Sequence, residues 1–422
     1  MPRPVTVALI GAGSRGADVY GRYIAQHPEL GRVVAVAESR PAHRAGAAEQ
    51  HGIAASHTFA SWEDLLEGGR LADALIIATP DVLHVEPAKA ALALGYRVLL
   101  EKPIAPTLAG VLELAAAART STGSLTVAHV LRHSAFFATI KRLLDQGRIG
   151  DLIHVQHTEN VGHWHFAHSF VRGNWRREDQ ASPMILAKAC HDLDLLRWLV
   201  GRPCTSVASY GGLRHFRLEN APAGSTQRCT GGCAVERECP YSALRIYLER
   251  FAGHDGWPNN VLTPEPNAES LLAALNDGPY GRCVYRCDND VADNQVVALN
   301  FEGGVAASLT VSAFTEENTR TLHLMGSHGE IHGHMERGEL IVDDFAADTR
   351  EAVAVPTVGS GHSGADEALL IDFLERVGDE HAGAPPTGLE ASIDSHLMAF
   401  AAEESRLSGA SVLVGAPTRT FS

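Results

Sequence analysis

Residues 5–16 have the sequence Val-Thr-Val-Ala-Leu-Ile-Gly-Ala-Gly-Ser-Arg-Gly, and this stretch decides the fold. The apolar run 5–10 predicts a buried parallel strand, and the residues after Gly16 are compatible with a helix. A GxGxxG pattern between a strand and a helix is typical of a turn that binds dinucleotide phosphates. The glycines permit a tight turn, close approach of the pyrophosphate and close packing of helix on strand. We therefore predict cofactor contacts from Gly11, Ala12, Gly13, Ser14, Arg15 and Gly16.

An acidic residue follows at the distance that this pattern requires. Residues 33–37 form a second apolar strand, and Glu38 stands at its carboxyl end, where a carboxylate holds the adenosine ribose diol. This favours NAD over NADP, because a 2′-phosphate would be repelled, although Arg40 weakens the preference. The alternative is a glycine-rich turn of an ordinary α/β protein with Glu38 in a solvated loop.

The composition narrows the class of protein. The 422 residues are enough for two or three domains, and 45% hydrophobic with 20% charged residues is ordinary for a globular chain. The formal net charge of −15 argues against nucleic-acid and anionic-membrane partners. We find no apolar stretch of membrane-spanning length and no room for a signal peptide before the first strand. A cytoplasmic protein is expected.

Two units are predicted along the chain. In residues 1–150 strands and helices alternate, with further strands at 73–79, 97–100 and 125–129, which predicts a doubly wound parallel sheet. Ligands of such sheets gather at the carboxyl ends of the strands. The cofactor contacts expected there are Glu38, Thr79, Pro80, His84, Glu101 and Lys102.

From residue 151 to 422 the pattern is that of an α+β unit with a mainly antiparallel open sheet. Helices are expected at 191–200, 364–376 and 389–407, and residues 213–281 form an irregular, cysteine-containing insertion. Glycine-rich turns separate several of the expected strands, as in an antiparallel meander. The strands are predicted at 152–160, 291–301, 305–314, 320–325, 330–334 and 340–344.

Three motifs in this order resemble the Gfo/Idh/MocA family of NAD(P)-dependent enzymes. They are Gly11–Gly16, Glu101-Lys102-Pro103, and residues 188–201, Lys-Ala-Cys-His-Asp-Leu-Asp-Leu-Leu-Arg-Trp-Leu-Val-Gly. The resemblance implies an N-terminal Rossmann domain and a C-terminal α/β domain whose sheet walls the site. It also implies NAD as cofactor, a small carbohydrate as substrate, and a homo-oligomer formed through that sheet.

The resemblance also implies roles for particular residues. Lys102 matches the family lysine beside the nicotinamide, His191 the catalytic histidine, and Asp194 the carboxylate one turn further along the helix. Many family dehydrogenases carry Asp four residues before the histidine, where this chain has Ala187. The neighbouring Lys188 is therefore a candidate for part of that role.

Hydride transfer from a secondary alcohol needs a base for the hydroxyl proton. His191 suits that role, because its ordinary pKa lies near neutrality, and Lys102 suits stabilisation of the developing alkoxide. The alternatives are a surface lysine and a histidine packed at a helix start.

Residues 154–177 are rich in His, Trp and Arg. Trp faces suit sugar rings and Arg suits carboxylate, phosphate or sulfonate groups, so we expect an anionic substrate. A solvated loop at a subunit interface, its arginines neutralised by Glu178 and Asp179, is the equal alternative. The candidate substrate contacts are His163, Trp164, His165, Arg172, Trp175, Arg176 and Asp194.

The surplus of acid–base groups, including His163, His165 and Lys188, narrowly favours glycoside hydrolysis. In that route C3 of an anionic hexoside, sulfonated or carboxylated, is oxidised, the C1 substituent is eliminated, water adds, and C3 is reduced again. The alternatives are a plain NAD-dependent sugar or polyol dehydrogenase and a non-catalytic NAD-binding sensor.

Seven cysteines are present, an odd number that indicates thiols or metal ligands before disulfides. Cys229, Cys233 and Cys239 lie in the irregular insertion, with Cys283 and Cys287 downstream. A structural zinc site is one prediction and reduced thiols the other.

Overall fold

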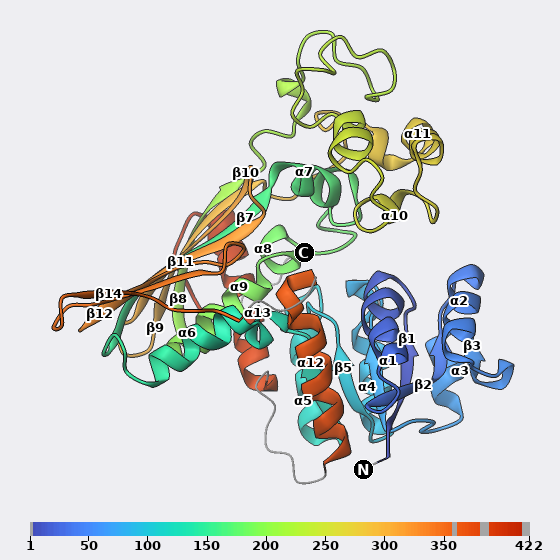
Figure 1. Cartoon of the computed structure of the whole chain (residues 1–422), viewed down its shortest axis with the longest axis horizontal. Coiled ribbons are helices and arrows are strands. Elements are labelled where there is room, and N and C mark those ends of the chain that lie inside the picture. The colour runs from blue at the N-terminus through green and yellow to red at the C-terminus, as the bar shows by residue number, and fades with distance from the viewer. Residues whose placement is uncertain (1–2, 357–360, 380–387, 416–422) are drawn as a thin grey trace.

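The computed structural model describes residues 3–356, 361–379 and 388–415 (Figure 1). Its first unit is built on a six-stranded sheet with the order β3-β2-β1-β4-β5-β6, in which all neighbours are parallel. This confirms the predicted doubly wound parallel sheet. The strands are β1 (Val5–Ile10), β2 (Gly31–Ala37), β3 (Thr58–Phe59), β4 (Ala74–Ile77), β5 (Arg97–Leu100) and β6 (Ser124–Val127).

Helices cover this sheet and bury its strands. All four residues of β4 are buried, as expected for a strand packed on both faces. Thr107 caps one helix by accepting a hydrogen bond from the Gly110 amide. The main helices are η1 (Ser14–Gly21) leading into α1 (Arg22–Gln26), α2 (Pro41–His51), α3 (Trp62–Glu67), α4 (Val85–Ala93) and α5 (Leu108–Thr120).

The second unit contains a nine-stranded sheet with the order β14-β13-β12-β11-β7-β10-β9-β8-β15. Its pairs are antiparallel except β7 with β10, which confirms the mainly antiparallel sheet. Burial alternates along β9, as in a strand with one covered face. The strands are β7 (Leu152–Gly162), β8 (Cys204–Gly212), β9 (Asn294–Phe301), β10 (Ala306–Thr315), β11 (Thr319–Gly326), β12 (Gly329–His334), β13 (Glu339–Asp344), β14 (Thr349–Ala352) and β15 (Val412–Leu413).

Helices pack on the inner face of this sheet and on the first unit. α6 (Ala135–Asp145), α8 (Met184–Ala187) and α9 (Cys190–Val200) follow the first unit, while α12 (Gly361–Gly378) and α13 (Leu389–Ser408) return from the C-terminal part (Figure 1). α13 packs against both α5 and α9, and the Ile104 amide donates to His396 of α13 at 2.8 Å. α13 therefore ties the two units together, while α12 packs on the first unit.

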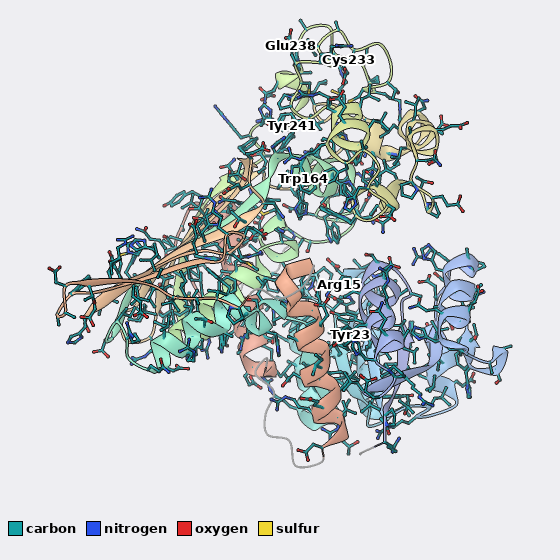
Figure 2. All side chains as sticks on the ribbon, in the orientation of Figure 1. Arg15, Tyr23, Trp164, Cys233, Glu238 and Tyr241 are labelled. Atoms are coloured by element: carbon teal, nitrogen blue, oxygen red, sulfur yellow. The ribbon has the colours of Figure 1, made fainter. Side chains whose placement is uncertain are left out.

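A third region, between β8 and β9, holds short helices and irregular chain and forms the upper lobe of Figure 1. It includes η7 (Arg245–Arg250), α10 (Asn259–Leu262) and α11 (Ala268–Asp277). The lobe packs on α7 (His163–Phe166) and η5 (Ala167–Arg172), where Trp164 lies 4.7 Å from the Phe251 ring (Figure 2). The predicted insertion is thus a lobe seated on the segment after β7.

Within the described ranges, no helix is both long enough and apolar enough to cross a membrane.

Candidate functional site

The glycine turn after β1 is sterically closed to larger residues. Gly11 has φ +89°, and a Cβ there would lie 2.6 Å from the carbonyl oxygen of Ala78. A Cβ on Gly16 would lie 1.9 Å from the Gly11 oxygen, so helix and strand touch at this point. A Cβ on Gly13 would meet only Nη2 of Arg40, at 3.4 Å, and Ser14 is exposed at the helix start. The turn therefore has the shape that brings backbone amides to a pyrophosphate.

Glu38 lies at the carboxyl end of β2, next to the glycine turn. Its side chain is buried, and Oε2 accepts a 2.9 Å hydrogen bond from the Ala12 amide. Arg40 donates to both carboxylate oxygens, at 2.9 and 2.8 Å. Although burial opposes ionisation, the Arg40 and amide hydrogen bonds lower the pKa of Glu38 to about 2. A charged acceptor thus stands where a ribose diol binds in such folds.

Arg15 of the glycine turn pairs with Glu101 at the end of β5. Its Nε donates to Glu101 Oε1 at 2.6 Å, and its Nη2 pairs with Asp366 of α12 at 2.7 Å. Tyr20 also donates to Glu101, at 2.6 Å. Burial raises the pKa of Glu101, but the positive charge of Arg15 outweighs this and the net shift is downward. In this arrangement Arg15 and Glu101, both predicted cofactor contacts, join the glycine turn to β5 and α12.

Lys102 reaches from the Rossmann edge to the second unit. Its Nζ donates to the carbonyl oxygen of Ala187, at the end of α8, at 2.8 Å. The loop that carries it is held by His84, whose ring nitrogens lie 2.7 Å from the Pro103 oxygen and 3.0 Å from the Thr79 oxygen. Pro80 precedes the short helix η3 (Asp81–Leu83) on the same edge. The structure therefore places Lys102 beside the segment that leads into α9.

His191 lies in the first turn of α9 and is 6% exposed. Its ring centre is 6.0 Å from that of His129, which follows β6. Burial, with the charges of Arg132 and Lys102, holds the pKa of His129 well below its usual range. The charge of Lys102 thus acts on His129, whose ring packs against that of His191.

Asp194, predicted as a substrate contact, is buried in α9, one turn after His191. It is 1% exposed, and Arg132 donates to its two oxygens at 2.7 and 2.5 Å. Burial raises the pKa of Asp194 despite the guanidinium. In this structure the carboxylate supports α9 from within.

Lys188 and Asp192, which flank His191 in the sequence, belong to a buried ionic network. Lys188 Nζ is 3.0 Å from Glu159 of β7, and Arg320 of β11 pairs with Glu159 at 2.7 Å and with Asp192 at 2.7 Å. His157 Nε2 lies 2.7 Å from the same Asp192 oxygen. Burial lowers the pKa of Lys188, although Glu159 partly offsets the effect. Two cations and two carboxylates therefore balance around the start of α9.

The residues of the His- and Trp-rich segment have diverse surroundings. His165 Nδ1 lies 2.9 Å from Asn318 Oδ1, and burial together with the charge of Lys188 lowers the pKa of His165 well below its usual range. His163 Nδ1 lies 3.3 Å from the Thr315 oxygen. Trp164 is 9% exposed and packs into the lobe, whereas Trp175 is 38% exposed. Of this group, His165 is the one placed within electrostatic reach of Lys188.

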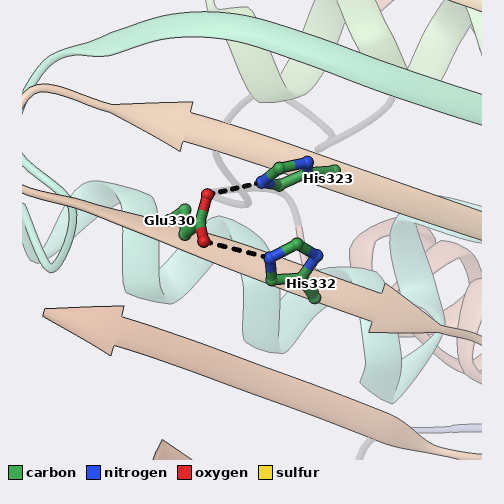
Figure 3. Close-up of side chains that lie close together, drawn as sticks. All are labelled: His323, Glu330 and His332. Carbon is green, nitrogen blue, oxygen red and sulfur yellow. Dashed lines mark hydrogen bonds and ion pairs between the residues drawn. The ribbon is translucent and has the colours of Figure 1, made fainter. Parts of the chain in front are cut away.

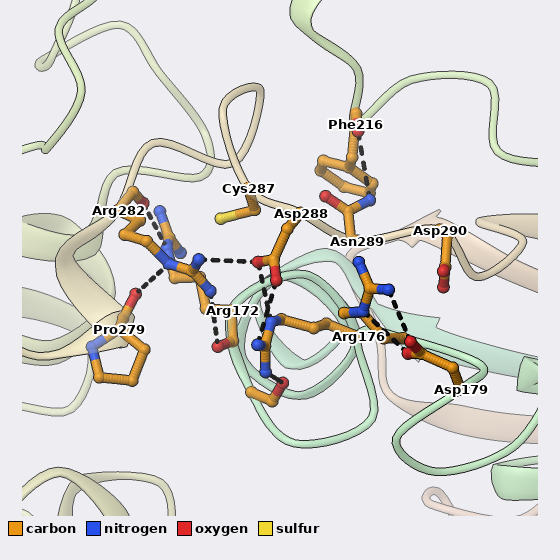
Figure 4. A network of polar contacts seen from close by, with 12 residues as sticks. Arg172, Arg176, Asp179, Phe216, Pro279, Arg282, Cys287, Asp288, Asn289 and Asp290 are labelled. Carbon is orange, nitrogen blue, oxygen red and sulfur yellow. Dashed lines mark hydrogen bonds and ion pairs between the residues drawn. The ribbon is translucent and has the colours of Figure 1, made fainter.

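The predicted cluster of free positive charge is neutralised in part: Arg176 and Arg177 are paired with carboxylates, whereas Arg172 is not (Figure 4). Arg176 donates to both oxygens of Asp288 at 2.9 and 3.1 Å. Arg177 is paired with Asp179 at 2.7 Å, as the alternative interpretation held. Arg172 is fully buried and donates to the carbonyl oxygens of Arg282 and Tyr241 at 2.8 and 2.7 Å.

One group of residues in the described parts of the chain has three potential metal-ligand atoms within 4.8 Å of one another, and it is His323, Glu330 and His332 (Figure 3). Glu330 joins the two stacked imidazoles on neighbouring strands, at 2.7 and 3.2 Å. The predicted zinc ligands Cys229, Cys233 and Cys239 do not form such a group, so the zinc prediction gains no support.

The sequence pointed to the glycine turn, Glu38, Lys102 and His191 as candidate site residues, but it did not point to the residues that support them in the structure. Tyr20, Glu159, Arg320, Asp366 and His396 come from distant positions, and neither a motif nor a period marks them. Only Asp192, inside the third motif, carried a signal.

The residues at the sheet edge fit a bound dinucleotide: the tight glycine turn at Gly11 and Gly16, an exposed helix start and the ionised Glu38. The fold and this edge define a dinucleotide-binding two-domain protein. Two family models match the chain. The oxidoreductase family with an NAD-binding Rossmann fold matches residues 5–129, and the C-terminal alpha/beta domain of that family matches residues 141–414. The chain belongs to this oxidoreductase family, Gfo/Idh/MocA, as its motifs predicted.

Relatives and solved structures agree with this assignment. The YteT protein of Bacillus subtilis (strain 168) is 25% identical over 321 residues, 72% of each chain. An inositol 2-dehydrogenase of Streptomyces avermitilis is 30% identical over 227 residues, 53% of this chain and 60% of its own length. A levoglucosan dehydrogenase solved with NADH and levoglucosan has the same fold, with a TM-score of 0.71 at 20% identity, covering 98% of this chain and 100% of that one.

Proposed function

We propose that the protein is an NAD-dependent dehydrogenase of a sugar or cyclic polyol. The observation that carries the proposal is the reach of Lys102, from the end of β5 to the Ala187 oxygen just before α9. It sets an ammonium from the Rossmann edge beside the segment that bears His191. The names of the relatives, inositol 2-dehydrogenase and levoglucosan dehydrogenase, support a polyhydroxylated ring as substrate.

In this proposal the glycine turn and Glu38 hold the dinucleotide. The bound NAD supplies a hydride acceptor. Ala12 fixes the Glu38 carboxylate from one side, and Arg40 covers both oxygens from the other. A ribose diol has to share this carboxylate with Arg40. Because Arg40 keeps Glu38 ionised, the negative carboxylate would repel the 2′-phosphate of NADP.

His191 takes the hydroxyl proton of the substrate carbinol, and Lys102 stabilises the oxygen as negative charge develops. The surroundings suit this division of labour. His191 lies in the first turn of α9, with its ring centre 6.0 Å from that of His129. Lys188 and Glu159 hold the backbone before α9 from the sheet side.

Replacement of Lys102 by Ala tests the proposal. We expect kcat to fall about 10³-fold, while the Kd for NAD, measured by calorimetry, changes less than about threefold. Lys141→Ala, at a helix pair with Asp145 away from the site, is the matched control and should keep full activity. Unchanged turnover in Lys102→Ala would refute the role given to Lys102, whereas NAD binding without turnover in the native protein would favour a non-catalytic NAD-binding sensor.

Glycoside hydrolysis is a second candidate, favoured by Lys188. Burial lowers the pKa of Lys188, and the charge of Lys188 acts on His165, so a second acid–base group lies within electrostatic reach of Lys188. The neutralised arginines offer no support for an anionic hexoside as its substrate. NADH absorbance and aglycone release are to be followed together on neutral and anionic aryl glycosides. Aglycone in large excess over NADH would favour this route, and stoichiometric NADH without aglycone the plain dehydrogenase.

We also propose self-association through the outer face of the nine-stranded sheet. Tyr210 and Val296 form a cross-strand pair on that face and are 67% and 49% exposed. Light scattering after size exclusion tests this proposal. Val296→Lys should lower the molar mass to that of a single chain, whereas Leu218→Lys in the lobe should not.

A further inference from the structure

The lobe above the site gathers cysteines that the proposed reaction does not use. Cys229, Cys233 and Cys239, from one irregular stretch, line a small cavity together with Cys283 from the stretch before β9. All are free thiols. Figure 2 shows Cys233 in this lobe, with Tyr241 closer to the sheet. Burial raises the pKa of Cys239, and the neighbouring Cys229 and Cys283 raise it further. The four thiols are thus neighbours across a fold of the chain.

A buried cation faces these thiols without a matching anion. Arg172 is completely buried, and its Nη2 lies 3.7 Å from Cys229 Sγ. Its other partners are carbonyl oxygens, and Nη1 has no hydrogen-bond partner. Among the described residues no carboxylate forms an ion pair with this guanidinium. A buried charge without a counter-charge is strongly unfavourable, so the site calls for an anionic occupant.

The spacing of the sulfurs distinguishes between metal groups. Four thiolates around one zinc ion, each about 2.3 Å from the metal, lie close to one another. No three of these sulfurs lie within 4.8 Å of one another in the described structure. An iron–sulfur cluster instead takes each thiolate at a separate iron, so its four ligands stand further apart and leave room between them. The amide of Ala243, 3.4 Å from Cys229 Sγ, supplies the N–H···S contact that such clusters use.

We propose that Cys229, Cys233, Cys239 and Cys283 ligate an iron–sulfur cluster of the four-iron class, with Arg172 as its buried counter-charge. Bound as thiolates, the four residues and the cluster carry net negative charge, which the guanidinium balances. The cluster joins the stretch 229–239 to the stretch 283–287 and so clasps a lobe that has little regular structure. The proposal is independent of the substrate.

The test begins with the unmodified protein, purified and reconstituted with ferrous iron and sulfide under anaerobic conditions. We expect about four iron and four acid-labile sulfide per chain, and a broad visible absorption that bleaches with dithionite. Stoichiometric zinc that iron does not displace, or a protein without metal whose thiols all react with a thiol reagent, would overturn the proposal.

Variants locate the ligands. Cys233→Ser and Cys239→Ser should each lose most of the iron and the visible absorption. Cys204→Ser, at a buried thiol in β8, is the matched control and should keep both. Cys287 donates to the Cys283 oxygen at 3.3 Å and does not line the cavity, so Cys287→Ser should also keep the cluster. A thermal melt that keeps the native number of transitions reports whether each variant, lobe included, is folded. Iron retained in folded Cys233→Ser and Cys239→Ser would refute the assignment.

Discussion

Replacement of Asp192 by Asn probes the ionic network that holds the start of α9. Asp192 is completely buried and accepts from Arg320 Nε and lies beside His157 Nε2, both at 2.7 Å. In the native network Lys188 and Arg320 are balanced by Glu159 and Asp192. The Asn variant keeps the shape but leaves one buried positive charge in excess.

The expected cost is about 3–5 kcal/mol, the range for removing one partner of a buried ion pair. For a unit of this size, 1 kcal/mol corresponds to about 2–4 °C, so the calorimetric Tm of the second unit should fall by roughly 6–20 °C. Asp145→Asn, which removes an exposed pair with Lys141, is the matched control and should cost less than about 0.5 kcal/mol. The double variant Asp192→Asn with Arg320→Gln restores neutrality and should cost less than the sum of its two single variants.

The pH dependence supplies a second check. Burial opposes ionisation of Asp192, but Arg320 and His157 outweigh it and lower the pKa of this carboxyl below its ordinary 3.8. The stabilisation by the carboxylate is therefore complete above pH 3.8 and is lost as the pH falls toward the folded-state pKa. The gap in Tm between native protein and Asp192→Asn should stay constant above about pH 5 and narrow below pH 3.8. A gap near zero at neutral pH, or additive single variants, would refute the charge-balance argument.

Three further predictions concern the two units and their junction. Glu38→Ala should weaken NAD binding about tenfold and reduce discrimination against NADP, because it removes the acceptor of the ribose diol and frees Arg40. Calorimetric titration with both cofactors checks this, and an unchanged ratio of the two affinities would contradict it. Gly16→Ala should abolish NAD binding or folding of the Rossmann unit, since its Cβ would meet the Gly11 oxygen at 1.9 Å. Gly46→Ala, with open space around it, is the control and should be neutral or slightly stabilising in thermal melts. Burial lowers the pKa of His396 to about 3, so the folded state binds its extra proton more weakly than the unfolded state does. Stability should therefore fall as the pH drops from 6.5 toward 3. His396→Gln should flatten that part of the Tm–pH curve, and an unaltered curve would count against this account.

Local pattern was enough for the Rossmann unit. The apolar run before Gly11 and the acid at Glu38 each lie within a few residues of the feature they determine, so strand, turn and ligand contact appear together in the sequence. The same holds for most strands of the second sheet, because one covered face imposes a period of two. The position of β7 between β10 and β11 was not predictable, since it depends on pairing of strands far apart in the chain.

The supports of the site were beyond sequence reasoning for a different reason. Glu159 and Arg320 face each other only because β7 and β11 are neighbours, and that adjacency has no local signal. Arg172 and Arg176 show the converse case. Their clustering in the sequence suggested an anion site, but folding brings Asp288 to one and buries the other among carbonyl oxygens and thiols. A cluster of arginines in the sequence therefore predicts an anion-binding site only if folding brings no carboxylate from a distant part of the chain to pair with them.

The same argument explains why the departure at Ala187 matters. An Asp at that position would place a carboxylate four residues before His191; this chain has an apolar residue there, and its carbonyl oxygen accepts from Lys102 instead. The carboxylates of Glu159 and Asp192 pair with Lys188 and Arg320, and that of Asp194 pairs with Arg132. Lys102 is thus held by a neutral acceptor, which a substrate hydroxyl can replace without breaking an ion pair. A lysine held in this way is ready to donate to an oxygen as it becomes negative, so the exchange of a side-chain carboxylate for a backbone carbonyl favours the role proposed for it.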